Sequence, residues 1–176
     1  MSLSGLVIVN YGKNQLVEST SGEIIRCVAR RGLPQIVCGD EVKWLRNADD
    51  SGVIETIRPR RSVLNRADGN SGQRPLGANI DQVVIEAALE PALDYFLIVK
   101  YCVAAELAQT TPLIVINKSD LLQDSDRERI DTLIEEYRRI GYTTLLTSAL
   151  KNSGIETFAE QLEGKTSILV GQSGVG

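Results

Sequence analysis

The sequence predicts a β + α/β protein, in which a small all-β barrel precedes an α/β unit with a parallel sheet. Two patterns lead to this prediction. Up to about residue 62, short apolar and β-branched segments alternate with turns rich in Gly, Asn and Asp, which is typical of a small barrel. From about residue 78, strand-like segments alternate with longer segments of helical periodicity, which is typical of a parallel sheet with helices on its faces.

The distribution of charge supports two modules. Residues 1–75 carry 11 Lys+Arg and 8 Asp+Glu, a net charge of +3, whereas residues 76–176 carry 8 and 15, a net charge of −7. A basic first part joined to an acidic second part suggests that the first part faces something anionic. The overall content of 43% apolar and 24% charged residues is ordinary for a soluble globular protein.

Residue types that are rare or absent exclude several kinds of site. The 176 residues contain no His, which excludes histidine-based nucleophilic triads and His-liganded metals within them. Cys27, Cys38 and Cys102 are an odd number without close pairing, so we expect buried free thiols rather than disulfides or a zinc site. No apolar run reaches the length of a membrane span and no signal-like leader opens the chain, so we expect a cytoplasmic protein.

The first module is predicted over residues 1–62 as an OB-fold, the small barrel of matching size. Turn signals rich in Gly, Asn and Asp separate its strands. The strands are expected at residues 6–9, 16–17, 23–28, 41–45 and 53–57.

Barrels of this kind often bind oligonucleotides, and the candidates for RNA contacts are Arg58, Arg60 and Arg61. The alternative interpretation is that these arginines are solvated surface charges on a barrel with a structural role. Tyr11 and Trp44 are the only aromatic residues of the first 62, which is few for a base-stacking platform. Both interpretations therefore stay open.

Residues 63–77 are predicted to be a linker, because they contain Gly, Pro, Asn and Ser with little apolar content. The second module follows over residues 78–176. A capping box formed by Ser125 and Glu128 is expected to start its second helix. The expected elements are a strand at 80–87, a helix at 91–109, a strand at 113–116, a helix from 125 to about 141, a strand at 142–146, a helix at 154–162 and a strand at 165–170.

The segment Asn117-Lys118-Ser119-Asp120 directly follows an apolar run at residues 112–116. Such a run predicts a strand buried on both faces, and open α/β sheets bind ligands outside the carboxyl ends of their strands. A carboxylate such as Asp120 can accept hydrogen bonds from guanine N1–H and the 2-amino group. An amide such as Asn117 can address O6 and N7, and the stem of Lys118 can cover the base. Since adenine has no 2-amino group, this strand end predicts a guanine pocket.

Ser148 and Ala149 follow the next predicted strand and suit the same ligand. A small residue there lets the backbone approach a base, and the Ala149 N–H can donate to guanine O6. A strand that ends in a Ser-capped turn is the plainer interpretation of this string when it is taken alone.

A partial phosphate-binding loop follows the last predicted strand. Gly171 and Gly176 have the spacing of the Gly-x-x-x-x-Gly-Lys-Ser/Thr loop, whose backbone N–H groups bind phosphates. The Lys and Ser/Thr of that motif are not among the 176 residues, so no catalytic residue and no metal ligand are assigned. The candidate nucleotide site comprises Asn117, Lys118, Ser119, Asp120, Ser148, Ala149, Gly171, Gln172, Ser173, Gly174, Val175 and Gly176.

The order of these motifs is unusual, because in ordinary GTPases the phosphate loop precedes the Asn-Lys-x-Asp strand. A permuted chain can still build one compact site when its original termini lay close together. This order, together with Gly39-Asp40-Glu41-Val42, Pro59-Arg60-Arg61-Ser62 and Arg74-Pro75-Leu76-Gly77-Ala78-Asn79-Ile80-Asp81-Gln82, resembles the circularly permuted ribosome small subunit-dependent GTPase A proteins of bacteria. The resemblance covers nearly the whole chain, and Gly77, where Ala is expected, is a minor departure.

The resemblance implies an OB-fold that contacts ribosomal RNA, followed by a partial, circularly permuted P-loop GTPase domain. It implies GTP or GDP as the ligand, Mg²⁺ held by residues beyond Gly176, and zinc in a further C-terminal domain. The implied function is GTP hydrolysis, stimulated by the small ribosomal subunit, in late maturation of that subunit. We expect a monomer that does not bind membranes, and we expect residues 1–176 alone to hydrolyse nothing.

A second hypothesis is a non-catalytic RNA-binding protein whose second module is a degenerate nucleotide-binding domain. The residues after Gly176 would discriminate between the two hypotheses. Lys-Ser or Lys-Thr at that place supports an enzyme, because these residues contact the β- and γ-phosphates and Mg²⁺.

Overall fold

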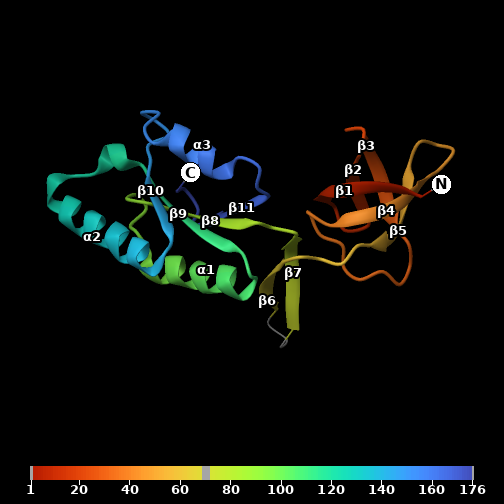
Figure 1. Cartoon of the computed structure of the whole chain (residues 1–176), viewed down its shortest axis with the longest axis horizontal. Coiled ribbons are helices and arrows are strands. Elements are labelled where there is room, and N and C mark those ends of the chain that lie inside the picture. Colours follow the sequence, from red (N-terminus) through yellow and green to blue (C-terminus); the bar gives the residue numbers. More distant parts are fainter. Residues whose placement is uncertain (1, 69–71, 176) are drawn as a thin grey trace. The chain divides into compact units, whose positions relative to one another are not determined.

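The computed structural model describes residues 2–68 and 72–175 of the chain. The chain divides into two compact units, Met1–Ile80 and Asp81–Gly176, and Figure 1 follows it through both.

The first unit contains the predicted OB-like barrel. Five strands close in the order β1-β2-β3-β5-β4, and neighbouring strands are antiparallel except β3 and β5, which are parallel. Because the barrel is closed, none of its five strands has a free edge. The strands are β1 Leu3–Asn10, β2 Asn14–Ser19, β3 Ile24–Ala29, β4 Glu41–Arg46 and β5 Gly52–Ile57.

Alternating residues of these strands fill the inside of the barrel. Gly5 and Gly52 make room for Trp44, since a Cβ at Gly52 would lie 2.8 Å from Trp44 Cε3. Trp44 is therefore a core residue, and of the two aromatic side chains in the barrel only Tyr11 is exposed. The buried cluster consists of Val7, Val17, Ile25, Cys27, Ile36, Val42, Trp44 and Ile54.

Residues 63–77, predicted to be a linker, form an antiparallel hairpin instead. Its strands are β6 Val63–Asp68 and β7 Gly72–Ala78, and the residues that connect them lie outside the described part of the chain. Pro75 lies opposite Asn65, next to a shift in strand register. Such a bulge tolerates the missing N–H of proline. Gly and Pro here therefore mark an irregular hairpin and not a coil.

This hairpin belongs to the first unit. Leu64 and Ala78 are buried, and the Ala78 N–H donates to the Cys38 carbonyl oxygen at 3.0 Å. Gly39 allows this close approach, because a Cβ on it would collide with the Ala78 carbonyl oxygen and its φ of 88° favours glycine.

The second unit is a parallel sheet with helices, as the sequence predicts. The strand order is β10-β9-β8-β11, and all three neighbouring pairs are parallel. Since the strands are parallel, their carboxyl ends share one edge of the sheet. The elements are β8 Gln82–Ala88, α1 Tyr95–Leu107, β9 Thr111–Asn117, the 3₁₀ turn η1 Ser119–Leu121, α2 Asp124–Ile140, β10 Thr143–Leu146, α3 Ile155–Leu162 and β11 Ser167–Gly171.

The two central strands, β8 and β9, are almost entirely buried. α1 packs against both of them and buries Ile98, Cys102 and Ala105. A separate apolar cluster consists of Val84, Leu113 and Val115 with Leu145, Phe158 and Leu162 packed against it, so that α3 is joined to the sheet. The continuous apolar runs in β8 and β9 thus reflect burial on both faces.

The helix ends follow the prediction only in part. α2 ends at Gly141 as expected, with φ of 100° at its C-cap. Its N-cap is Gln123, which makes no side-chain capping bond, so the predicted capping box of Ser125 and Glu128 is wrong. Acidic residues in the first turn of α2 stabilise the helix through its dipole instead. α1 begins later than predicted and is capped by Asp94, which accepts from the Leu97 N–H at 3.0 Å.

All three cysteines are free, but only two are buried as predicted. Burial raises the pKa of the Cys27 and Cys102 thiols to about 11. Cys38 is exposed, because it lies in the irregular segment between β3 and β4 and not in a core-facing strand. In the part of the chain that the structure describes, no helix combines the length and apolar content needed to cross a membrane.

Candidate functional site

Three strand ends meet at the carboxyl edge of the second unit's sheet. β9 ends at Asn117, β10 leads into Thr147, and β11 leads into the loop at residues 172–175. The Thr147 N–H donates to the Ile116 carbonyl oxygen at 2.8 Å, and the Ser119 N–H donates to the Thr147 carbonyl oxygen at 2.9 Å. The structure therefore brings the predicted segments together.

The buried side chain of Asn117 connects all three strand ends. Its Nδ2 donates to the Val175 carbonyl oxygen at 3.0 Å. Its Oδ1 accepts from Thr147 Oγ1 at 3.3 Å and from the Ala149 N–H at 3.2 Å. Both lone pairs of Oδ1 are thus occupied, while Nδ2 keeps one N–H. Asn117 can offer a ligand a donor but no acceptor, and the Ala149 N–H, expected to face guanine O6, donates to Asn117.

Lys118 joins two loops through its ammonium group. Its Nζ donates to the Glu90 carbonyl oxygen at 2.7 Å and to the Gly174 carbonyl oxygen at 2.5 Å. Its backbone has φ of 60°, at the turn from β9 into η1. With both ends of the side chain fixed, the apolar stem of Lys118 has a defined place beside the loop that follows β11.

Asp120 is exposed and is held by Ser148. Ser148 Oγ accepts from the Lys151 N–H at 3.1 Å and donates a short hydrogen bond to Asp120 Oδ1. Asp120 Oδ2 has no protein partner among residues 2–68 and 72–175. Ser148 therefore acts as a positioning residue, and one carboxylate oxygen of Asp120 remains open to a ligand.

Gly171 lets β11 approach β8 closely, since a Cβ on it would collide with the carbonyl oxygen of Glu86. The next two side chains, Gln172 and Ser173, are exposed. Glycine at this position thus determines where the loop begins.

The loop continues through Gly174, whose φ of 87° favours glycine, to Val175, which is buried. The N–H groups of residues 173–175 make no hydrogen bond to any other described residue. They are consequently available to an anion. Gly176, the second glycine of the predicted motif, lies outside the described residues.

Arg60, predicted to contact RNA, forms an ion pair with Asp40 inside the first unit. Its Nε lies 2.7 Å from Asp40 Oδ1, and its Nη2 lies 2.9 Å from Asp40 Oδ2 and 2.6 Å from the Gln35 carbonyl oxygen. Asp40 is fully buried. The guanidinium group is occupied by these acceptors, so the geometry favours a structural role for Arg60.

Arg58 and Arg61 are exposed. Arg58 Nη1 lies 3.4 Å from Glu41 Oε2 in a surface ion pair. The Arg61 backbone N–H donates to Asn79 Oδ1 at 2.8 Å, and its Nη2 donates to the Asn79 carbonyl oxygen at 3.4 Å. Both side chains lie at the surface, where a phosphate can reach them.

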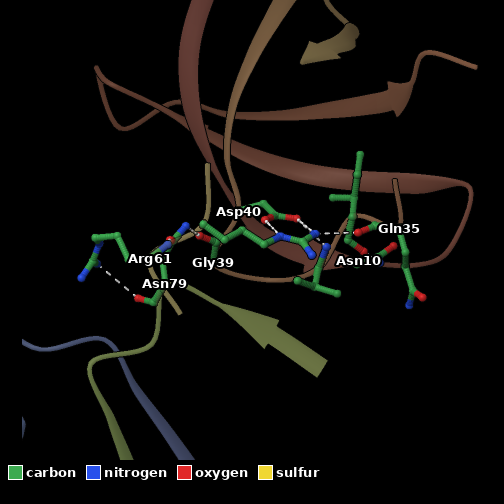
Figure 2. A network of polar contacts seen from close by, with 9 residues as sticks. Asn10, Gln35, Gly39, Asp40, Arg61 and Asn79 are labelled. Atoms are coloured by element: carbon green, nitrogen blue, oxygen red, sulfur yellow. Dashed lines mark hydrogen bonds and ion pairs between the residues drawn. The ribbon is translucent and has the colours of Figure 1, made fainter. Parts of the chain in front are cut away.

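Asp40 and Asn79 are structural residues that the sequence interpretation missed (Figure 2). Asp40 Oδ2 also accepts from the Val37 N–H at 2.8 Å. Asn79, with φ of 55°, donates from Nδ2 to the Gly39 carbonyl oxygen at 2.7 Å and from its N–H to the Ser62 carbonyl oxygen at 2.9 Å. The sequence does contain a Gly-Asp pair at Asp40 and a polar residue at Asn79. Their partners lie 20 and 40 residues away along the chain, so the sequence alone does not reveal these contacts.

Known proteins similar to this chain identify its family. The profile of the RsgA GTPase family matches residues 57–176, more than half of the chain. The chain belongs to the RsgA GTPase family. The predicted family is confirmed.

Members of the RsgA family match nearly all of this chain. The small ribosomal subunit biogenesis GTPase RsgA of Sodalis glossinidius is 44% identical over 176 residues, which cover 98% of this chain and 51% of that protein. The corresponding RsgA 1 of Vibrio parahaemolyticus is 42% identical over 180 residues, which cover 99% and 51%. The chain thus spans about half the length of the curated relatives it matches.

Two solved structures share the fold. The crystal structure of YjeQ from Thermotoga maritima has a TM-score of 0.83 and 32% identity, and the match covers all of this chain and 62% of that one. YloQ, described as a circularly permuted GTPase, has a TM-score of 0.78 and 28% identity over the same shares of the two chains. The predicted fold class is therefore confirmed for both units.

Proposed function

We propose that the full-length protein binds and hydrolyses GTP and acts in maturation of the small ribosomal subunit. The observation that carries this proposal is the hydrogen bond from Asn117 Nδ2 to the Val175 carbonyl oxygen. This bond joins the end of β9, which carries side chains able to pair with guanine, to the loop after β11, whose N–H groups can bind phosphate. The relatives named as small ribosomal subunit biogenesis GTPases support the biological role.

The base is recognised by its hydrogen-bonding edge. The open Oδ2 of Asp120 and the remaining lone pair of Oδ1, whose other lone pair accepts from Ser148, accept from guanine N1–H and the 2-amino group. The remaining N–H of Asn117 donates to an acceptor of the base, N7 or O6, and the stem of Lys118 covers its face. Adenine has a donor at the 6 position and lacks the 2-amino group, so GTP is preferred over ATP.

The phosphates are bound by the loop after β11. Its residues Gly171, Gln172, Ser173, Gly174, Val175 and Gly176 provide backbone N–H groups, and those of residues 173–175 have no acceptor in the described part of the chain. Successive N–H groups that point to one side form a concave site for anions. Phosphate binding therefore depends on the backbone, and the side chains of this loop contribute little.

Hydrolysis requires groups that these residues do not provide. Bound Mg²⁺ neutralises charge on the β- and γ-phosphates. No three His, Cys, Asp or Glu side chains within residues 2–68 and 72–175 lie close enough to hold a metal ion. A Mg²⁺ ion bound with GTP is held mainly by a Ser/Thr hydroxyl, phosphate oxygens and water, and we propose that its protein ligand lies beyond Gly176. The zinc site implied by the resemblance is assigned there too, and metal analysis of the full-length protein tests it.

The barrel is proposed to bind ribosomal RNA of the small subunit. Arg58 and Arg61 are exposed and provide positive charge, whereas Arg60 supports the barrel through Asp40. Binding to small subunits should weaken as salt rises, because phosphate contacts release counterions. We further propose a cytoplasmic monomer. A co-sedimentation assay with Arg58→Ala and Arg61→Ala tests the RNA contacts, and unchanged binding in both variants would remove these residues from the interface.

Nucleotide titration of the full-length protein tests the proposed activity. GTP and GDP should bind and ATP should not, and GTP turnover should rise when small subunits are added. ATP binding equal to that of GTP would contradict the guanine assignment. The second candidate, a non-catalytic RNA-binding protein, is favoured if small subunits bind but no guanine nucleotide does.

A further inference from the structure

Glu86 is a charged residue in an otherwise buried strand. Every other residue of β8 is buried, and Glu86 is half-buried. Its side chain makes no hydrogen bond or ion pair with any residue that the structure describes. Base recognition and phosphate binding, as proposed, do not use this side chain.

The neighbours of Glu86 place it beside the phosphate loop. In the parallel register it lies opposite Gly171 of β11 and Val115 of β9. A Cβ on Gly171 would lie 3.2 Å from Glu86 Cβ and 3.1 Å from Val175 Cγ2. The stem of Glu86 is therefore adjacent to Gly171, where β11 leads into the loop, and close to Val175, the last loop residue that the structure describes.

The surroundings of Glu86 on the sheet are apolar. Val115 belongs to the apolar cluster that also contains Val84 and Leu113. Val84 lies two residues before Glu86 in the same strand, so both side chains point to the same face. A charge in apolar surroundings is screened less than a charge in water. Glu86 therefore adds a negative potential at the base of a loop whose N–H groups attract anions.

We propose that Glu86 is a specificity-determining residue, which weakens nucleotide binding in proportion to phosphate charge and makes the site prefer GDP over GTP. This inference rests on the proposed guanine-nucleotide function of the same site. The γ-phosphate gives GTP more negative charge than GDP, so a fixed carboxylate repels GTP more strongly. The preference opposes accumulation of the GTP-bound state until another interaction compensates for it.

The test is Glu86→Gln in the full-length protein, which removes the charge and keeps the shape. Binding of GDP and of a non-hydrolysable GTP analogue is measured by calorimetry at low and high salt. We expect the analogue to bind about threefold to tenfold more tightly, with a smaller gain for GDP. The difference should shrink as salt rises. Glu86→Met removes the same charge with an apolar side chain and should give the same shift, even where the amide disturbs packing.

Glu55→Gln is the matched control. Glu55 is also a half-buried glutamate in a strand, β5 of the barrel, and its replacement removes the same charge from the molecule. We expect this variant to leave both affinities unchanged. Unchanged or weaker binding in the Glu86 variants, an equal gain for both nucleotides, or the same gain in Glu55→Gln would overturn the inference. Failure of the wild-type protein to bind either nucleotide would instead contradict the proposed function itself, and the inference with it.

Discussion

At the scale of single residues, Asp120 gives the sharpest test of the guanine pocket. Asp120→Asn places an amide donor opposite the 2-amino group of guanine, while its remaining oxygen can still accept from N1–H. One hydrogen bond is therefore lost, and the other loses its charged acceptor. We expect GTP affinity of the full-length protein to fall by about a hundredfold. Xanthosine triphosphate, which has a 2-oxo acceptor, should bind more tightly. Competition titration measures both.

Asp124→Asn is the control for Asp120→Asn, since Asp124 is an exposed carboxylate in the first turn of α2. It should leave nucleotide selectivity unchanged. If Asp120→Asn binds GTP as the wild type does, Asp120 does not read the base.

The Asp40–Arg60 pair makes a prediction about stability. The side chain of Asp40 is 0% exposed and that of Arg60 is 19% exposed. Arg60→Ala leaves a buried carboxylate without its partner and should lower the free energy of unfolding by about 3 kcal/mol. Arg58→Ala breaks a surface ion pair with Glu41 and should cost less than about 1 kcal/mol. Urea unfolding distinguishes the two, and equal effects would show that Arg60 is not a structural residue.

The two buried thiols lead to a prediction about how stability and thiol reactivity depend on pH. Burial raises the pKa of Cys27 and Cys102 from 9.0 to about 11 in the folded protein. Their contribution to stability is therefore complete below pH 9 and is lost as pH rises towards 11. At pH 8 an alkylating reagent should modify the exposed Cys38 and spare the other two. Mass spectrometry of the folded protein checks this, and modification of Cys102 ahead of Cys38 would contradict it.

At the scale of elements, Gly171 governs the position of β11 and its loop. Gly171→Ala introduces a Cβ that collides with the Glu86 carbonyl oxygen. We expect lower thermal stability and at least tenfold weaker nucleotide binding, about 1.4 kcal/mol, because the loop shifts away from the strand end of β9. Gly72→Ala is the control, since a Cβ there meets no atom within 4 Å. Melting temperature and GDP affinity measure both effects, and a normal Gly171→Ala variant would show that β11 can adjust.

The sequence predicts a helix or strand correctly where the spacing of its apolar residues matches the side chains that the fold buries. The apolar runs of β8 and β9 identify central strands, and the polar residues after β9 indicate where the candidate site lies. The hairpin of β6 and β7 was missed because its stability comes from pairing with each other and from Ala78, which Gly and Pro content does not reveal. The role of Arg60 was missed because its partner, Asp40, is twenty residues away. The sequence also does not show which hydrogen-bonding groups of Asn117 stay available to a ligand, because its partners Thr147 and Val175 follow other strands.

At the scale of the whole molecule, the groups proposed to bind the nucleotide and those needed to hydrolyse it lie in different parts of the protein. Residues 1–176 contain the groups that we propose to read the base and the start of the proposed phosphate loop, but not the Lys and Ser/Thr of its motif. A polypeptide of residues 1–176 should therefore show no GTP turnover above the uncatalysed rate. Phosphate release with radiolabelled GTP is the measurement. Turnover by this polypeptide would mean that hydrolysis uses groups other than those proposed.

The parallel pairing of β8 with β11 has a consequence for the order in which the chain folds. Gln82 pairs with Ser167, so the two strands meet only after the intervening helices have been made. Contacts between residues so far apart carry a large entropy of loop closure and form slowly. During synthesis the barrel and the β8–β9 pair can form while β11 is still in the ribosomal tunnel. Among the described parts of the candidate nucleotide site, the loop after β11 is consequently the last to take its place, and we expect a nascent chain to bind no nucleotide before β11 has paired with β8.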